Sequence, residues 1–282
     1  MSRPDEPSMI ADDATRPLFR KLPPLDGPLP HSEKSVAASP DELPNRNVAF
    51  VALRTAGELL GSAAVIVLLF LAYQLFVADE IAARQQDALV DRVEAEWEAP
   101  TQLETPQEVE ALAVLRIPRL GTDYRRAVVQ GTNGAALAQG PGHYSDTAMP
   151  GEVGNFAVAG HRDGRGSPFQ ELDELRPGDP VIVETADTWY VYRVLGDSGS
   201  GKFTGDASGI PGRQIVSPDA VQVISPTPNQ PASAAASGRY LTLTTCHPEY
   251  SARQRLIVHA VLDGTGTPKS ELPDGPEELR EA

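Results

Sequence analysis

The chain has 282 residues, enough for one or two domains, and carries a net charge of −15. It contains no basic stripe and no basic patch interleaved with aromatic residues, so nucleic acid is not an expected partner. Residues 1–46 and 264–282 are rich in polar residues and proline and lack apolar periodicity. Such segments bury too little apolar surface to offset their ordering entropy, so both ends are predicted to be disordered.

The first strong signal along the chain is an apolar run at residues 59–78, which contains no charged side chain. At about 1.5 Å per residue, a helix of this length spans roughly 30 Å, the thickness of a bilayer's hydrocarbon core. Arg46 and Arg54 precede the run, whereas Asp79 and Glu80 follow it. The positive-inside rule therefore predicts a single-pass signal anchor in the cell membrane, with a cytoplasmic N-terminus and an extracellular C-terminal domain.

The segment after the predicted span, residues 79–98, is highly charged and helix-prone. Leu89, Val93 and Trp97 recur every four residues and form a narrow apolar stripe. The stripe allows packing on the following domain or on a partner helix. The preferred interpretation is a largely solvated stalk helix, ended by Pro100.

From residue 111 onward the sequence consists of short apolar runs rich in Val, Ile, Tyr and Thr, separated by turn signals. Two of these runs, joined by residues 186–188, predict a β-hairpin, and short helical turns are expected at 135–138 and 168–172. Eight strands in about 150 residues predict an all-β fold with a closed or nearly closed eight-stranded barrel. The expected strands are 113–117, 126–129, 155–160, 180–185, 189–194, 220–224, 240–245 and 255–262.

These signals divide the chain into six predicted parts. They are a disordered tail over 1–46, a juxtamembrane segment over 47–58, a transmembrane helix over 59–78, an extracellular stalk and linker over 79–110, a β-barrel domain over 111–263 and a disordered tail over 264–282.

Cys246 is the only cysteine of the chain. It directly follows the predicted strand 240–245, and Pro248 prevents the strand from continuing. In an exported domain a lone cysteine has no intrachain disulfide partner, so it is a free thiol or pairs with another molecule. The alternative is that Cys246 serves only as a small buried apolar residue.

Arg255 opens the next predicted strand, nine residues after Cys246. If the two strands pair antiparallel, Arg255 returns beside Cys246. A guanidinium near a thiol favours the thiolate and donates hydrogen bonds to a developing oxyanion. The alternative for Arg255 is a surface ion pair.

A thiol nucleophile needs an acid–base partner, and histidine titrates in the required range. Of the five histidines, His31 lies in the N-terminal tail, His259 lies within the last strand and His247 adjoins the cysteine. His161 follows a short apolar strand and precedes a glycine-rich loop, whereas His143 lies in a turn. The residues alone rank His161 first and His143 second, and they leave both open.

Three stretches of the sequence resemble the sortase family of cysteine transpeptidases. They are Leu115-Arg-Ile-Pro-Arg-Leu-Gly, Gly154-Asn-Phe-Ala-Val-Ala-Gly-His161-Arg, and Leu241-Thr-Leu-Thr-Thr-Cys246 through Arg255-Leu-Ile-Val. They occur in the family's order and spacing and cover roughly residues 111–262. The pair His143-Tyr144 and the run Cys246-His-Pro-Glu-Tyr-Ser-Ala-Arg-Gln-Arg are most similar to class E, the housekeeping sortases of high-GC Gram-positive bacteria.

The resemblance implies an eight-stranded barrel with Cys246 as nucleophile, His161 as general acid and base, and Arg255 as the arginine that stabilises the oxyanion. Arg253 lies two residues from Arg255 and is assigned a secondary role at the site, or none.

By the same resemblance, Thr245 helps to hold the substrate or the oxyanion, with ordinary strand packing as its alternative. Tyr144 matches a family position linked to tolerance of Ala in place of Pro in the sorting signal, with a barrel-edge aromatic as its alternative.

The implied reaction is cleavage of a secreted protein's C-terminal LPxTG- or LAxTG-like sorting signal between Thr and Gly through a thioester. The acyl group then passes to a cell-wall amine on lipid II or a peptidoglycan stem peptide. No cofactor is implied, and the acidic residues near the glycine-rich loop (Asp163, Glu171, Asp173 and Glu174) are interpreted as a solvated loop and not as a metal site.

Other classes stay as alternatives. A pilus-polymerising sortase typically carries an Asp-Pro-aromatic lid motif, which is not found here. A papain-like protease or peptidoglycan hydrolase has its nucleophile on a helix, before its histidine in the chain. A non-enzymatic anchored β-barrel that binds wall polymers would leave Cys246 unreactive.

Overall fold

The computed structural model of the chain describes residues 46–76, 78–98, 111–164, 166–204 and 206–280. The chain divides into two units, residues Met1–Gly57 and Glu58–Ala282. The predicted disorder of residues 1–46 lies outside the described residues except for Arg46, and so does the linker at 99–110.

The first described element is α1, Arg46–Phe76. By length and composition, its stretch Asn47–Tyr73 suffices to cross a membrane. The helix begins well before the predicted span at 59–78. The side chains along 47–73 are exposed, including large ones such as Phe70 and Leu60. An exposed apolar surface of this length fits a helix surrounded by lipid.

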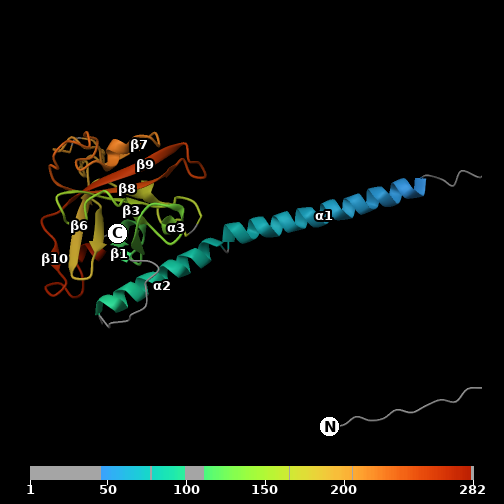
Figure 1. The fold of residues 1–282 in the computed structure, drawn as a ribbon, viewed down its shortest axis with the longest axis horizontal. Coiled ribbons are helices and arrows are strands. Elements are labelled where there is room, and N and C mark those ends of the chain that lie inside the picture. The colour runs from blue at the N-terminus through green and yellow to red at the C-terminus, as the bar shows by residue number, and fades with distance from the viewer. Residues whose placement is uncertain (1–45, 77, 99–110, 165, 205, 281–282) are drawn as a thin grey trace, which may run out of the picture. The chain divides into compact units, whose positions relative to one another are not determined.

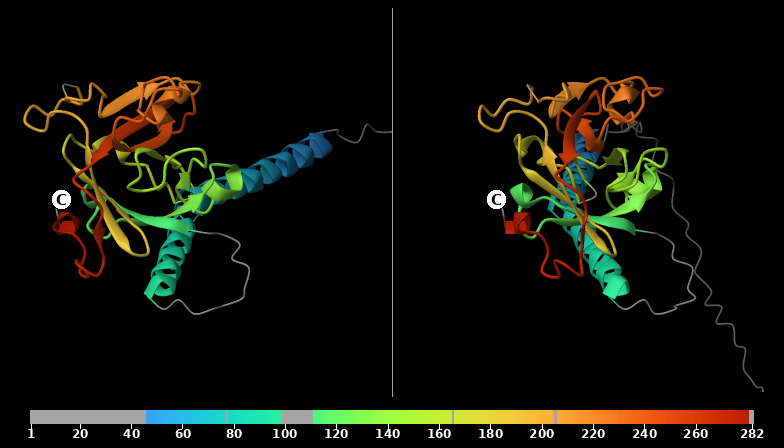
Figure 2. Two further views of the ribbon diagram at one scale, coloured as in Figure 1. Left: turned by 60° about the vertical axis from the view of Figure 1, so that its left-hand side comes forward. Right: turned by 90° about the vertical axis from the view of Figure 1, so that its left-hand side faces the viewer.

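The remaining elements build a barrel (Figures 1 and 2). The strands run in the order β6-β5-β1-β2-β3-β4-β8-β9, and a further pairing between β6 and β9 closes the ring. The predicted eight-stranded closed barrel is therefore confirmed. The strands are β1 Ala111–Arg116, β2 Arg125–Gln130, β3 Gly142–His143, β4 Gly154–Ala159, β5 Pro180–Glu184, β6 Thr188–Val194, β7 Arg213–Val216, β8 Arg239–His247, β9 Gln254–Leu262 and β10 Thr267–Pro268.

Short helices lie in the connections between strands and after the last strand. They are α3 Gly134–Leu137, η1 Pro118–Leu120, η2 Leu172–Glu174, η3 Val221–Ile224 and η4 Glu277–Arg280. The predicted turn at 135–138 corresponds to α3, and the predicted hairpin is formed by β5 and β6. Most strand pairs are antiparallel, whereas β2–β3 and β4–β8 are parallel.

The prediction of a strand at 220–224 is wrong, because Val221–Ile224 forms the 3-10 helix η3. The hydroxyl of Ser217 bonds the Asp219 carboxylate, and this local turn directs the chain away from an extended path. The sequence missed β7, β3 and β10, which are too short or too polar to give an alternating pattern.

Helix α2, Ala78–Glu98, packs on the barrel, so the preferred interpretation of a solvated stalk is wrong. Val90 is fully buried against Val114 of β1 and Ala127 of β2. The side chain of Gln86 is also buried, and its carbonyl accepts a hydrogen bond from the Ala127 backbone N–H at 3.0 Å. Its amide donates to the carbonyl of Gln139. The helix therefore completes backbone hydrogen bonding on the outside of the barrel.

The prediction of a disordered C-terminal tail is wrong for residues 264–280. β10 pairs with β6, and the Trp189 indole N–H donates to the Leu272 carbonyl at 3.1 Å. The Lys269 ammonium bonds Glu184 at 2.7 Å and lies 4.6 Å from the centre of the Trp97 ring. The segment is polar in composition, but it covers the Trp189 strand and neutralises a buried carboxylate.

The Gln86 contact gives a test of the packing of α2. Gln86→Ala should lower the free energy of unfolding by about 1–3 kcal/mol, because the buried N–H of Ala127 loses its acceptor. Gln85→Ala is the matched control, since Gln85 is the exposed neighbour on the same helix. Denaturant unfolding of the full chain in detergent measures both. Equal stability of the two variants would contradict the docked helix.

Candidate active site

Three neighbouring strands bring the predicted catalytic residues together. β4 and β8 are parallel, and their last paired residues are Ala159 and Thr244. His161 follows two residues after Ala159, and Cys246 follows two residues after Thr244, so both lie beyond the last pair of the same parallel register. β8 and β9 are antiparallel, and Cys246 lies directly opposite Arg255. Since neighbouring strands lie about 4.8 Å apart, Cys246 stands between the histidine and the arginine at one end of the sheet.

The alternation of β8 decides which way the cysteine faces. Leu241 and Leu243 are buried in the barrel core, so Thr242, Thr244 and Cys246 face outward. Cys246 is a free thiol and is partly exposed. The thiol therefore lies on the outer surface of the barrel, at a strand end, and not in the core.

His161 leaves β4 through a tight loop. The Phe169 ring packs directly over Gly160, where a Cβ would collide with it. The Phe169 N–H donates to the His161 carbonyl at 3.0 Å, so the chain folds back immediately after the histidine. The glycine before His161 thus permits the close packing that fixes this loop.

Thr245 and Tyr144 occupy different places around the cysteine. The Thr245 hydroxyl is buried and donates to the Gly160 carbonyl at 2.8 Å, so it ties β8 to the end of β4. That contact favours the packing role of Thr245. The Tyr144 hydroxyl lies 3.0 Å from the Thr244 hydroxyl, on the outward face that Cys246 shares.

The two arginines differ in how they are held. Arg255 is half-buried in β9, and its Nη1 donates to the carbonyls of Ala252 at 3.0 Å and Gln254 at 2.9 Å. Arg253 is exposed in the loop before β9 and is not paired with Cys246 in the sheet. The strand pairing therefore places the backbone of Arg255, and not that of Arg253, opposite Cys246.

The second-ranked histidine, His143, is committed to the barrel. It is buried, its Nδ1 lies 3.2 Å from the Gln130 side-chain oxygen, and its Nε2 lies 3.0 Å from the Thr147 hydroxyl. Burial lowers the pKa of His143 below its ordinary value. Both ring nitrogens are engaged away from Cys246, so the structure removes His143 from the candidates.

His259 lies within β9 as predicted for a structural histidine. Its Nδ1 is 2.9 Å from the Thr242 hydroxyl, and its Nε2 is 2.9 Å from the Gln214 amide. The Thr242 hydroxyl donates to the Asn155 carbonyl oxygen, so it accepts from His259 Nδ1–H, while Nε2 accepts from Gln214. Complete burial lowers the pKa of His259 to about 3 and keeps the ring neutral.

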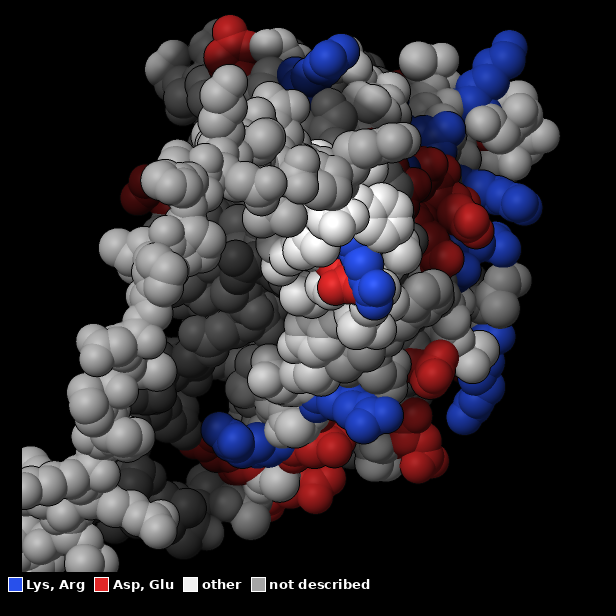
Figure 3. All heavy atoms as spheres, turned by 90° about the vertical axis from the view of Figure 1, so that its right-hand side faces the viewer, with Lys and Arg blue, Asp and Glu red and all other residues white. Residues whose placement is uncertain are grey.

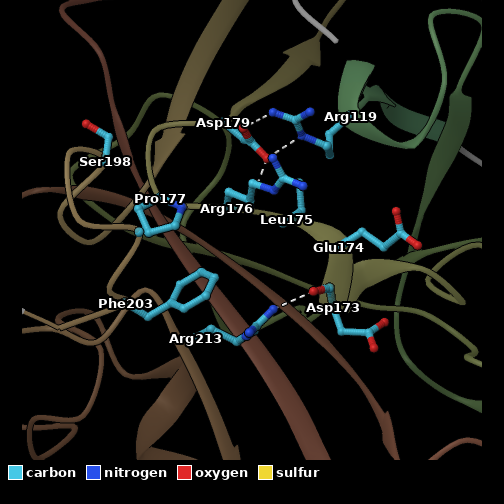
Figure 4. A pocket seen from close by; sticks show the side chains of 11 residues that line it. Arg119, Asp173, Glu174, Leu175, Arg176, Pro177, Asp179, Ser198, Phe203 and Arg213 are labelled. Atoms are coloured by element: carbon cyan, nitrogen blue, oxygen red, sulfur yellow. Dashed lines mark hydrogen bonds and ion pairs between the residues drawn. The ribbon is translucent and has the colours of Figure 1, made fainter.

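A pocket of about 820 Å³ is lined by residues other than Cys246 (Figure 4). It is lined from η1, η2, the connection after β6, and β7. Arg119 forms a two-bond ion pair with Asp179 at 2.9 Å, and Arg213 lies 4.1 Å over the Phe203 ring. None of the predicted catalytic residues lines the pocket.

The charges elsewhere are mixed. On the face drawn in Figure 3, acidic and basic side chains are interspersed and do not gather into a patch of one sign. Within the described residues, no three His, Cys, Asp or Glu side chains are grouped as a metal site. Near the histidine loop, Asp163 accepts from the Tyr250 N–H at 2.8 Å, and Asp173 pairs with Arg162 at 2.8 Å.

Comparison with known proteins agrees with the barrel fold. The family model of the sortase domain matches residues 115–263. The chain therefore belongs to the sortase family. Sortase SrtE1 of Streptomyces coelicolor is 36% identical over 221 residues, which cover 74% of this chain and 57% of that protein. Sortase SrtE2 of the same organism is 31% identical over 251 residues, covering 80% of this chain and 90% of that protein.

Among solved structures, the SrtF sortase from Corynebacterium diphtheriae matches with a TM-score of 0.56 and 42% identity, over 65% of this chain and 98% of that one. The two Streptomyces relatives carry class E names, which confirms the resemblance to class E sortases.

The neutral His259 predicts a specific acid sensitivity. Its pKa is about 3 in the folded chain against an ordinary 6.5, so between these values the unfolded state binds the extra proton and stability falls as pH falls. At pH 5 this costs about 2 kcal/mol relative to neutral pH.

The measurement is denaturant unfolding of the full chain in detergent at several pH values, for the wild type and His259→Gln. The variant should lose less stability between pH 7 and pH 5 by about the same 2 kcal/mol. Parallel profiles for the two proteins would mean that His259 is not held neutral by burial.

Proposed function

We propose that the chain is a membrane-anchored cysteine transpeptidase that cleaves a C-terminal sorting signal and transfers the acyl group to an amine. One observation carries the proposal: Cys246 lies on β8 between the end of β4, where His161 follows, and Arg255 on β9. Membership of the sortase family supports the same reaction class.

In the first half-reaction, the Cys246 thiolate attacks the carbonyl carbon of the Thr–Gly bond in an LPxTG- or LAxTG-like signal. Arg255 donates hydrogen bonds to the oxyanion that develops on the carbonyl oxygen. His161 gives its proton to the glycine amine as the carbon–nitrogen bond breaks. The products are a thioester on Cys246 and the released C-terminal fragment.

In the second half-reaction, a cell-wall amine attacks the thioester carbon. His161, now neutral, accepts the proton from the attacking amine, and Arg255 again stabilises the oxyanion. The thiolate leaves, and the protein is joined to the amine through a new amide bond. The donors would be secreted proteins, and the acceptor would be lipid II or a peptidoglycan stem peptide.

The apolar helix α1 supports a single-pass anchor, with the catalytic domain on the outer side of the membrane. The direction follows from the basic residues before the span and the acidic residues after it. On that side a lone thiol meets both secreted proteins and wall precursors.

The direct test incubates the full chain in detergent with paired LPxTG and LAxTG peptides and an amine acceptor, with mass spectrometry as the readout. We expect an acyl-enzyme at Cys246, cleavage between Thr and Gly, and amide product. Cys246→Ala should abolish all three. A folded wild-type chain that gives neither acyl-enzyme nor cleavage with any sorting peptide would overturn the proposal.

The same assay separates the two arginines. Arg255→Ala should lower kcat by about 100- to 1,000-fold, because an oxyanion donor is lost. Arg253→Ala is the matched control and should change kcat by only a few-fold, since Arg253 is exposed in the preceding loop. The reverse order of effects would assign the oxyanion role to Arg253.

A further inference from the structure

Two side-chain hydrogen bonds flank the Cys246–His161 pair. On one side, Thr245 donates to the carbonyl of Gly160, the residue before the histidine. On the other side, Arg162, the residue after the histidine, lies 3.3 Å through Nη1 from Nδ1 of His247, the residue after the cysteine. The residue before Cys246 thus bonds the residue before His161, and the residue after Cys246 bonds the residue after His161.

Arg162 is unusual for an arginine because it is buried, with 6% of its surface exposed. Its Nη2 bonds the Asp173 carboxylate of η2 at 2.8 Å. The guanidinium therefore connects three segments: the loop after β4, the end of β8 and η2. Asp163, the next residue, accepts a hydrogen bond from the Tyr250 N–H at 2.8 Å. This bond also connects the loop after β4 to the loop between β8 and β9.

The contact also fixes the direction of the hydrogen bond to His247. A guanidinium only donates hydrogen bonds, so Nδ1 of His247 is the acceptor in this contact. The bond requires an acceptor at the Nδ1 position of residue 247 and not at the Nε2 position. Substitutions that place an acceptor at one position or the other can therefore distinguish this hydrogen bond from a packing contact.

Stability alone is a poor reason for this arrangement. A buried guanidinium is costly to desolvate, and an apolar side chain of similar size is often as stabilising or more so. The Nε of Arg162 is buried without a hydrogen-bond partner among the described residues, an additional cost. The buried Arg162 guanidinium is better explained by the positions in which it holds the segments that it connects.

We infer that Arg162 is a positioning residue, which holds His161 against Cys246 by clamping His247. The inference rests on the proposed function for what the Cys246–His161 pair does, but not for the clamp itself. Loss of the clamp frees the loop after β4 at the position next to His161. A displacement of about 1 Å at a reacting group can cost roughly 100-fold in rate.

The experiment uses the full chain in detergent and two readouts. The first is kcat/KM with the sorting peptide that the wild type prefers. The second is the rate of alkylation of Cys246 by iodoacetamide as a function of pH, which needs no peptide substrate. The pH dependence of this rate reports how the His161 imidazole influences the Cys246 thiol. The His161→Ala variant supplies the reference profile of a Cys246 thiol without the imidazole.

Arg162→Met should lower kcat/KM by about 10- to 100-fold and move the alkylation profile to that of His161→Ala. In the His161→Ala background, Arg162→Met should change the alkylation profile no further. His247→Asn keeps an acceptor near Nδ1 and should retain the wild-type profile, whereas His247→Gln offers one near Nε2 and should resemble Arg162→Met. Arg176→Met, at an exposed arginine, is the matched control.

A merely structural role would lower the melting temperature of Arg162→Met and leave its alkylation profile unchanged, and this result would overturn the inference. Equal behaviour of His247→Asn and His247→Gln would do the same. If the wild type cleaves no sorting peptide but the alkylation profiles shift as described, the proposed function fails and the clamp stands.

Discussion

The parallel pairing of β4 and β8 is the constraint on which the site depends. Parallel strands leave the sheet at the same edge, so residues that are distant in sequence emerge side by side. The register pairs Ala159 with Thr244, so the chain leaves β4 toward His161 where β8 reaches Cys246, and the antiparallel return of β9 pairs Cys246 with Arg255. A slip of one residue in β8 would turn Cys246 into the barrel and Thr245 outward.

The register is held from both faces of the sheet. On the inner face Leu241 and Leu243 are buried in the core. On the outer face Thr242 joins a buried polar network, in which Asn155 donates to the carbonyl of Ser225 at 3.0 Å. The segment after β7 therefore covers the outer face at Thr242. Thr244 is also buried, whereas Cys246 at the strand end is partly exposed.

Much of this could be predicted from local sequence, because alternation and turn residues act over short distances. The β5–β6 hairpin, the position of Cys246 at a strand end and its pairing with Arg255 follow from such signals. The choice between His161 and His143 needed either the family resemblance or the structure, since it depends on what surrounds each ring. The clamp by Arg162 had no local signal beyond its position next to His161.

Two of the errors, the C-terminal tail and helix α2, concern segments whose order comes from tertiary contacts. The C-terminal tail is polar, but Lys269 finds Glu184 at 2.7 Å and the ring of Trp97 at 4.6 Å, partners on other elements. Helix α2 was predicted as solvated because its apolar stripe is narrow, and composition does not reveal that Gln86 completes backbone hydrogen bonds of the barrel. In both cases a polar group is buried together with its hydrogen-bond or ion-pair partner. Such a contact orders the segment without the wide apolar stripe by which a packed segment is recognised in a sequence.

The docking of α2 has a consequence for the position of the site. Gly166, in the loop after His161, lies against α2, where an added Cβ would stand 3.3 Å from the backbone of Ala82 and Ala83. The loop after His161 is thus packed against α2, and α2 begins at Ala78, five residues after the candidate span Asn47–Tyr73 ends. The contact that docks α2 therefore also supports the loop that carries His161.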